Sequence, residues 1–173
     1  NIQISGTKAD YKKPKVEWSD FKTWSGQVTE KGGKINCRLK ATDNSGISFV
    51  RVAFGKRPEE GERLIPDIHI IMKYNKNTGY YEGSSVQGKG IYYVASITAA
   101  DLFNNEVLYY NTQCESYSYY QPAQSIRKNL SASSVNLGIA ESDIPQETEK
   151  QPESEKEPVT QPTKEDVFVN KRS

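Results

Sequence analysis

Histidine, methionine and cysteine are scarce in this chain of 173 residues, which has one His, one Met and two Cys. Because zinc sites are built mainly from Cys and His, no zinc site is expected. His69 is the only histidine, and no nucleophile elbow, phosphate-binding loop or HExxH motif occurs. The sequence therefore offers no catalytic centre, and we expect a protein that is not an enzyme and has no cofactor.

Long apolar runs and a strong charge of one sign are also missing. No stretch reaches the roughly 18 consecutive apolar residues of a membrane helix, so no membrane-spanning segment is expected. The 23 Lys and Arg nearly balance the 22 Asp and Glu, for a net charge of +1. The basic residues are scattered along the chain instead of clustering with aromatic ones, which argues against nucleic-acid binding.

The near-zero net charge averages over two unlike regions. Residues 141–173 hold nine acidic and five basic residues, four of the eight prolines and none of the twelve glycines. Such a segment cannot bury enough apolar surface to offset the roughly 1–2 kcal/mol of backbone entropy lost per ordered residue. We predict that residues 123–173 form a disordered tail or linker, which the spaced prolines make semi-stiff.

Short runs rich in β-branched and aromatic residues fill the rest of the chain. Apolar and polar residues alternate within them, which puts one face of each strand in a core and the other in water. Gly, Asn and Asp clusters separate the runs and are typical of turns. The pattern predicts an all-β, two-sheet antiparallel sandwich over residues 14–122, with residues 1–13 as an N-terminal extension or linker. The seven expected strands are 14–22, 34–42, 47–55, 67–74, 78–85, 91–100 and 105–113.

Four motifs follow one another within residues 14–112. They are Gly32-Gly33, the run from Ala41-Thr42-Asp43 to Val50, the run from Thr78 to Gly83, and the run from Asp101 to Asn105. In this order they resemble bacterial immunoglobulin-like domains, which recur in Gram-positive surface proteins and in secreted cell-wall or polysaccharide enzymes. Asn104 stands where that family more often has Gly, at a left-handed position that Asn tolerates. The resemblance implies an immunoglobulin-like sandwich, beside flanking domains, in an extracellular, secreted or cell-wall-associated protein.

Such modules serve several purposes, so more than one function stays open. The first expectation is a non-catalytic module of an exported bacterial surface protein, either a structural spacer or an adhesion domain for a host or cell-wall protein or glycan. The alternative is a carbohydrate-binding accessory module of a larger secreted enzyme, whose exposed aromatic side chains stack on sugar rings. The candidate ligand-binding residues are Trp18, Trp24, Tyr117, Tyr119 and Tyr120. If these side chains pack in or over the core, their role is structural.

Two pairs of residues complete the candidates. Cys37 alternates in phase with apolar neighbours and is expected to face inward, while Cys114 follows the last expected strand. In an exported protein they can form a disulfide, worth up to about 4 kcal/mol in the chain-entropy model, or else Cys37 is a buried free thiol. Asp43 and Asp101 lie in turns, where carboxylates either contribute to a calcium site or cap the turn itself.

Overall fold

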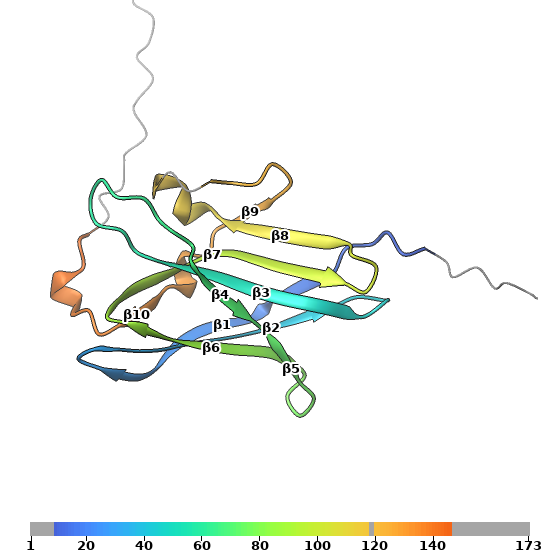
Figure 1. The fold of residues 1–173 in the computed structure, drawn as a ribbon, viewed down its shortest axis with the longest axis horizontal. Coiled ribbons are helices and arrows are strands. Elements are labelled where there is room, and N and C mark those ends of the chain that lie inside the picture. Colours follow the sequence, from blue (N-terminus) through green and yellow to red (C-terminus); the bar gives the residue numbers. More distant parts are fainter. Residues whose placement is uncertain (1–8, 118–119, 147–173) are drawn as a thin grey trace, which may run out of the picture.

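Two β-sheets pack face to face as a sandwich in the computed structural model, which describes residues 9–117 and 120–146 (Figure 1). The smaller sheet has the strand order β1-β2-β6-β5, and the larger has the order β4-β3-β7-β8-β9, with β10 paired to β7. The strands are β1 (Lys15–Thr29), β2 (Gly32–Thr42), β3 (Ile47–Lys56), β4 (Ile68–Ile71), β5 (Lys73–Asn75), β6 (Tyr80–Gly88), β7 (Gly90–Asp101), β8 (Glu106–Asn111), β9 (Ile126–Lys128) and β10 (Val135–Leu137). Short 3-10 helices cover Thr112–Tyr117 (η1), Ser131–Ser133 (η2) and Glu141–Asp143 (η3). The expected all-β sandwich is confirmed.

The alternation in the sequence sets which side chains face the core. In β2, Ile35, Cys37 and Leu39 are buried between the sheets, whereas the polar residues between them are partly exposed. The inward-facing residues of the central strands of both sheets join them in one apolar cluster. Burying such side chains removes apolar area from water at about 25 cal/mol per Å², which is the main force that holds the two sheets together.

The strand expected at 67–74 is divided between the two sheets. β4 pairs with β3 in the larger sheet, and β5 pairs with β6 in the smaller one. Met72 lies between them with its side chain buried, and its N–H donates a hydrogen bond to Val50 O at 2.8 Å. The crossing needs a glycine beneath it, because a Cβ on Gly83 would lie only 2.4 Å from Ile70 Cγ2.

The structure corrects the expected boundary at residue 122, because residues 123–146 continue the fold. β9 pairs in parallel with β8, and β10 pairs antiparallel with β7. Leu130, Val135 and Leu137 are buried in the core. Three well-placed apolar side chains and backbone pairing suffice here, although the composition averaged over 123–173 hides them. The part of the predicted tail from 147 on, like residues 1–8 of the predicted extension, lies outside the described residues.

The described chain enters and leaves the sandwich at opposite ends (Figure 1). The first described residues, in blue, approach at one end of the long axis, and the last ones, in orange, lie at the other. Within the described part of the chain, no helix is long and apolar enough to cross a membrane.

Candidate functional site

Trp18 lies in a bulge of β1 that packs against the larger sheet. The bulge arises because residues 18–21 of β1 stand opposite Leu39 alone in β2. The Trp18 ring contacts Tyr109 edge-on, with 4.6 Å between ring centroids, and Lys128 Nζ lies 4.4 Å from the centre of the Trp18 ring. Phe21 packs edge-on against the same ring at 6.0 Å. These contacts close the edge between the sheets, so the position of Trp18 favours the structural role.

The tyrosines near the end of the sandwich do not form one exposed platform. Tyr117 lies in η1 and packs against Tyr93, with ring centroids 5.9 Å apart, beside a small apolar cluster. Tyr120 is 75% exposed in a segment without regular structure. Tyr119 lies outside the described residues. Both described tyrosines follow β8 of the larger sheet, whereas Trp24 belongs to the smaller one.

Trp24 is exposed on the outer face of the smaller sheet. It pairs in register with Asn36 of β2, which lies between the inward-facing Ile35 and Cys37. Directly paired residues of antiparallel strands point to the same side, so Trp24 and Asn36 share the outer face. The Trp24 side chain is 46% exposed, which leaves much of a large aromatic surface in water.

Two adjoining hollows share Trp24 and Arg38 as lining residues. The larger lies on this outer face, and the smaller extends over the edge strand β1 to Ala132 and Ser133 of η2. Their volumes are about 810 and 490 Å³. We call the two hollows together the Trp24 groove. Lys73 of β5 pairs with Glu82 and lines the larger hollow with Trp24. Tyr74, the next residue, also borders the hollow, but it pairs with Tyr81 and packs against that ring, so its side chain points to the opposite face of the sheet. Sequence reasoning missed Lys73, because only the crossing at Met72 brings β5 into the same sheet as Trp24.

The polar side chains of the Trp24 groove are held in place by their neighbours. Glu82 accepts hydrogen bonds from Asn75 Nδ2 at 3.1 Å and from Thr78 Oγ1 at 3.0 Å. The Arg38 guanidinium lies 4.4 Å from the centre of the Tyr80 ring, a distance suited to a cation–π interaction. Arg38 Nε is buried and has no hydrogen-bond partner within the described part of the chain. Fixed polar groups beside the exposed Trp24 ring can orient a ligand.

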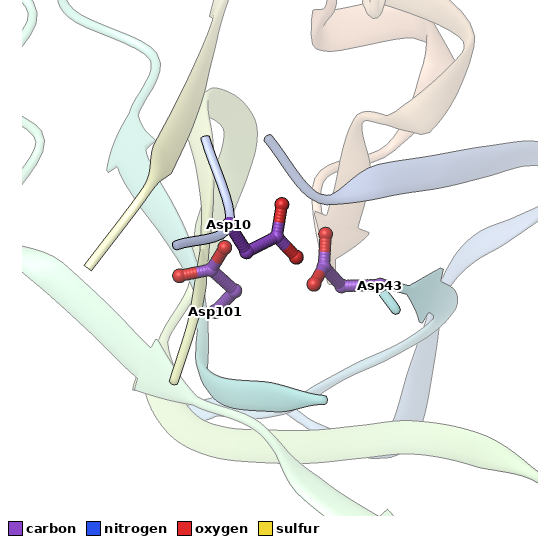
Figure 2. Close-up of side chains that lie close together, drawn as sticks. All are labelled: Asp10, Asp43 and Asp101. Carbon is purple, nitrogen blue, oxygen red and sulfur yellow. The ribbon is translucent and has the colours of Figure 1, made fainter. Parts of the chain in front are cut away.

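Asp43 and Asp101 lie together at one end of the sandwich, and Asp10 joins them (Figure 2). One carboxylate oxygen from each of the three residues lies within 4.8 Å of the other two. Asp10 comes from the segment before β1, Asp43 from the turn after β2, and Asp101 from the end of β7. Sequence reasoning assigned Asp10 to the extension and missed it. Such oxygen atoms are of the kind that calcium prefers.

The same carboxylates also cap turns, as the alternative interpretation stated. Asp43 Oδ1 accepts hydrogen bonds from the N–H and the hydroxyl of Ser45, at 2.8 and 2.6 Å. Asp101 Oδ1 accepts from the N–H groups of Phe103 and Asn105, both at 2.8 Å. Burial by itself would raise the pKa of Asp101, but the hydrogen bonds, led by those from Asn105, lower it below its ordinary value. These oxygens are thus already engaged by the protein.

Of the two possibilities left open for the cysteines, the free thiol is the one observed: Cys37 and Cys114 are not bonded, and both are buried. Cys37 lies between the sheets, with its Sγ 3.4 Å from Met72 Sδ. Cys114 belongs to a separate cluster that includes Tyr93 and Tyr110, on the other face of the larger sheet. The larger sheet therefore separates the two sulfur atoms. Burial raises the pKa of each thiol to about 12, so neither forms a reactive thiolate at neutral pH.

Comparison with protein-family models, with curated proteins and with solved structures finds no match to this chain. His69 is exposed on β4, between the partly buried Ile68 and the buried Ile70, on the solvent-facing side that its alternation with these residues predicts. A β-sandwich supports many unrelated functions, so the function has to be argued from the Trp24 groove and the carboxylate cluster themselves.

Proposed function

We propose that this chain is a non-catalytic, immunoglobulin-like module of an exported bacterial surface protein and that it binds a ligand in the Trp24 groove. The observation that carries the proposal is the 46% exposed Trp24 side chain on a hollowed, polar sheet face. Tryptophan contributes a large contact area at low conformational cost, which is why it is enriched where proteins bind their partners. A ligand that covered Trp24 would remove that apolar area from water.

The backbone at the resembling motifs supports the immunoglobulin-like assignment. Asn104 has a φ of 64°, the left-handed conformation for which the family uses Gly. Gly79, within the Thr78–Gly83 motif, has a φ of 74° and forms the turn between β5 and β6. These two left-handed turns are the observations that support the proposal. The extracellular location rests on this resemblance alone.

The lining of the Trp24 groove favours a glycan over a protein as ligand. Protein interfaces commonly have an apolar centre with a polar rim, whereas the groove places Asn36, Arg38 and Glu82 beside Trp24. Sugar rings combine an apolar face, which stacks on aromatic rings, with hydroxyl groups that need hydrogen-bond partners. A glycan-binding module fits a surface adhesin and also an accessory module of a secreted enzyme.

A second role, as a spacer between neighbouring segments, is favoured by where the chain enters and leaves. These points lie at opposite ends of the long axis (Figure 1), so the sandwich would add its full length to a string of modules. The strand pairing that spans this length would resist extension. The spacer role requires no ligand and is compatible with binding in the groove.

The test is binding of the full chain to an array of bacterial cell-wall glycans, host glycans and matrix proteins. We expect saturable glycan binding that is lost in Trp24→Ala. Tyr120→Ala is the matched control, because it removes another exposed aromatic ring outside the groove and should leave binding unchanged. Circular dichroism would check that both variants are folded. If wild type melts cooperatively but binds nothing, the binding role is wrong and the spacer role remains.

A further inference from the structure

Positive charge is concentrated around the Trp24 groove. The side chains that line it include four cations, Lys22, Arg38, Lys73 and Lys76, and one carboxylate, that of Glu82. The groove therefore carries a net charge of +3, although the whole chain carries only +1. The cations come from three strands and the turn after β5, so the tertiary structure assembles a charge pattern that is scattered along the sequence.

The groove also combines stacking, pairing and accepting groups at short range. Trp24 lies opposite Asn36 in the β1–β2 register, and Arg38 lies opposite Glu82 in the β2–β6 register. The guanidinium of Arg38 can pair with a carboxylate or sulfate through two parallel hydrogen bonds. Glu82, oriented by Asn75 and Thr78, can accept hydrogen bonds from hydroxyl groups.

We propose that the Trp24 groove binds an acidic glycan, a saccharide chain whose rings carry carboxylate or sulfate groups. One ring stacks on Trp24, its anionic group pairs with Arg38 and the lysines at the rim, and a hydroxyl donates to Glu82. This inference rests on the proposed binding function and adds the class of ligand.

The carboxylate of Glu82 favours an acidic glycan over two other anionic polymers, nucleic acids and acidic peptides. A nucleic acid would stack on Trp24 and pair with the cations, but its phosphates would meet the fixed carboxylate of Glu82, with few hydroxyl groups to satisfy it. An acidic peptide would meet the same carboxylate and offers no flat apolar ring face to Trp24. A saccharide with both hydroxyl and anionic groups can pair with Glu82 as well as with Arg38 and the lysines.

The test is titration of the full chain with defined polymers, followed by calorimetry and by quenching of tryptophan fluorescence. The probes are hyaluronan oligosaccharides, which carry carboxylates, heparin oligosaccharides, which also carry sulfates, and neutral cello-oligosaccharides. Oligothymidylate and polyglutamate represent the other anionic polymers. We expect at least one acidic saccharide to bind more tightly than all the other probes, with an affinity that falls as salt is added.

Charge variants locate the interaction. Lys73→Gln with Lys76→Gln removes two exposed charges at the rim and should weaken binding of the acidic saccharide by roughly three- to tenfold. Lys34→Gln is the matched control, because Lys34 lies on the outer face of β2 but does not line the groove. It should leave the affinity unchanged. Equal losses in the double variant and in Lys34→Gln would overturn the proposed site.

The outcomes separate this inference from the function on which it rests. Neutral and acidic saccharides that bind equally tightly, with loss in Trp24→Ala, would overturn the acidic ligand and keep the glycan-binding groove. Tighter binding of oligothymidylate or polyglutamate than of any saccharide would overturn both the acidic glycan and the glycan assignment. Absence of binding to every probe and to the glycan and protein array would overturn the inference and the binding function together.

Discussion

The outer faces of the two sheets differ in what covers them. On the larger sheet, Tyr93 and Tyr110 are buried beneath the loop that holds Leu64 and beside the short helix η1. On the smaller sheet, Trp24 remains 46% exposed in a polar groove, and η2 reaches only the edge of that groove, through Ala132 and Ser133. The tyrosines that crowd the end of the sandwich in the sequence therefore belong mainly to a second packing cluster. The exposed face of the smaller sheet is instead marked by one residue, Trp24. The two outer faces differ because a loop and η1 cover the aromatic residues of the larger sheet, whereas Trp24 on the smaller sheet stays in contact with water.

The largest expected effect tests this difference directly. Tyr110→Ala should lower the free energy of unfolding by about 3–5 kcal/mol, because it leaves a cavity in the cluster on the larger sheet. Trp24→Ala should lower it by less, by about 1–2 kcal/mol, because nearly half of the Trp24 side chain is already in water. Urea unfolding followed by circular dichroism measures both values. Similar values for the two variants would contradict the assignment of one face to packing and the other to binding.

A smaller effect is expected at Asn111, which helps to attach the segment that contains β9 and β10 to the larger sheet. Asn111 is fully buried, its Nδ2 donates to Val94 O at 2.7 Å, and its Oδ1 accepts from the N–H of Leu130 at 3.0 Å. Asn111→Ala should lower the free energy of unfolding by about 1–3 kcal/mol, because buried partners lose their hydrogen bonds. Amide hydrogen exchange should then speed up most in β9 and β10.

The control for this prediction is Asn44→Ala, in an exposed turn. It should change the free energy of unfolding by no more than about 0.5 kcal/mol. If exchange in β9 and β10 is as fast in wild type as in Asn111→Ala, residues 123–146 are not attached to the sandwich in the way described.

The smallest effect concerns the carboxylate cluster at the end of the sandwich. Because the pKa of Asp101 is lowered in the folded state, its charged form stabilises the fold above its ordinary pKa of 3.8. This stability should be lost as the pH falls below that value and through the lower pKa of the folded protein. Asp101→Asn should flatten that part of the pH dependence, as thermal melts between pH 2 and 6, roughly spanning both pKa values, would show.

Calcium distinguishes the two interpretations of the same cluster. Turn capping uses the oxygens of Asp43 and Asp101 within the protein, so the melting temperature at neutral pH should not depend on added calcium or a chelator. A calcium site would instead raise the melting temperature with calcium, through binding to the folded state only, and Asp43→Asn would remove that rise.

Much of the fold could be predicted because a strand signals itself locally. The alternation of Ile35, Cys37 and Leu39 predicts both the strand and its inward face, and the left-handed residue at Asn104 follows from a motif of five residues. The end of the sandwich could not be predicted in this way. β9 and β10 have three residues each, too few for a periodic pattern, and they are stable because β8 and β7 offer them backbone partners.

The candidate site shows the same division. Trp24, Asp43 and Asp101 could be singled out because aromatic rings and turn carboxylates are visible as residue types. Their partners Lys73 and Asp10 could not, since each is brought in by a segment distant in the sequence. Likewise, two cysteines are compatible with a disulfide until the larger sheet is seen to lie between them.

The sequence by itself determined the class of fold, the approximate positions of most strands and the inward face of those that alternate clearly, such as β2, because side-chain alternation along a strand is a local property. The tertiary structure alone decided which aromatic residues are exposed, which carboxylates meet and where the positive charge gathers. Exposure and proximity depend on which strands pair and which segments cover them, and those are contacts between residues far apart in the chain.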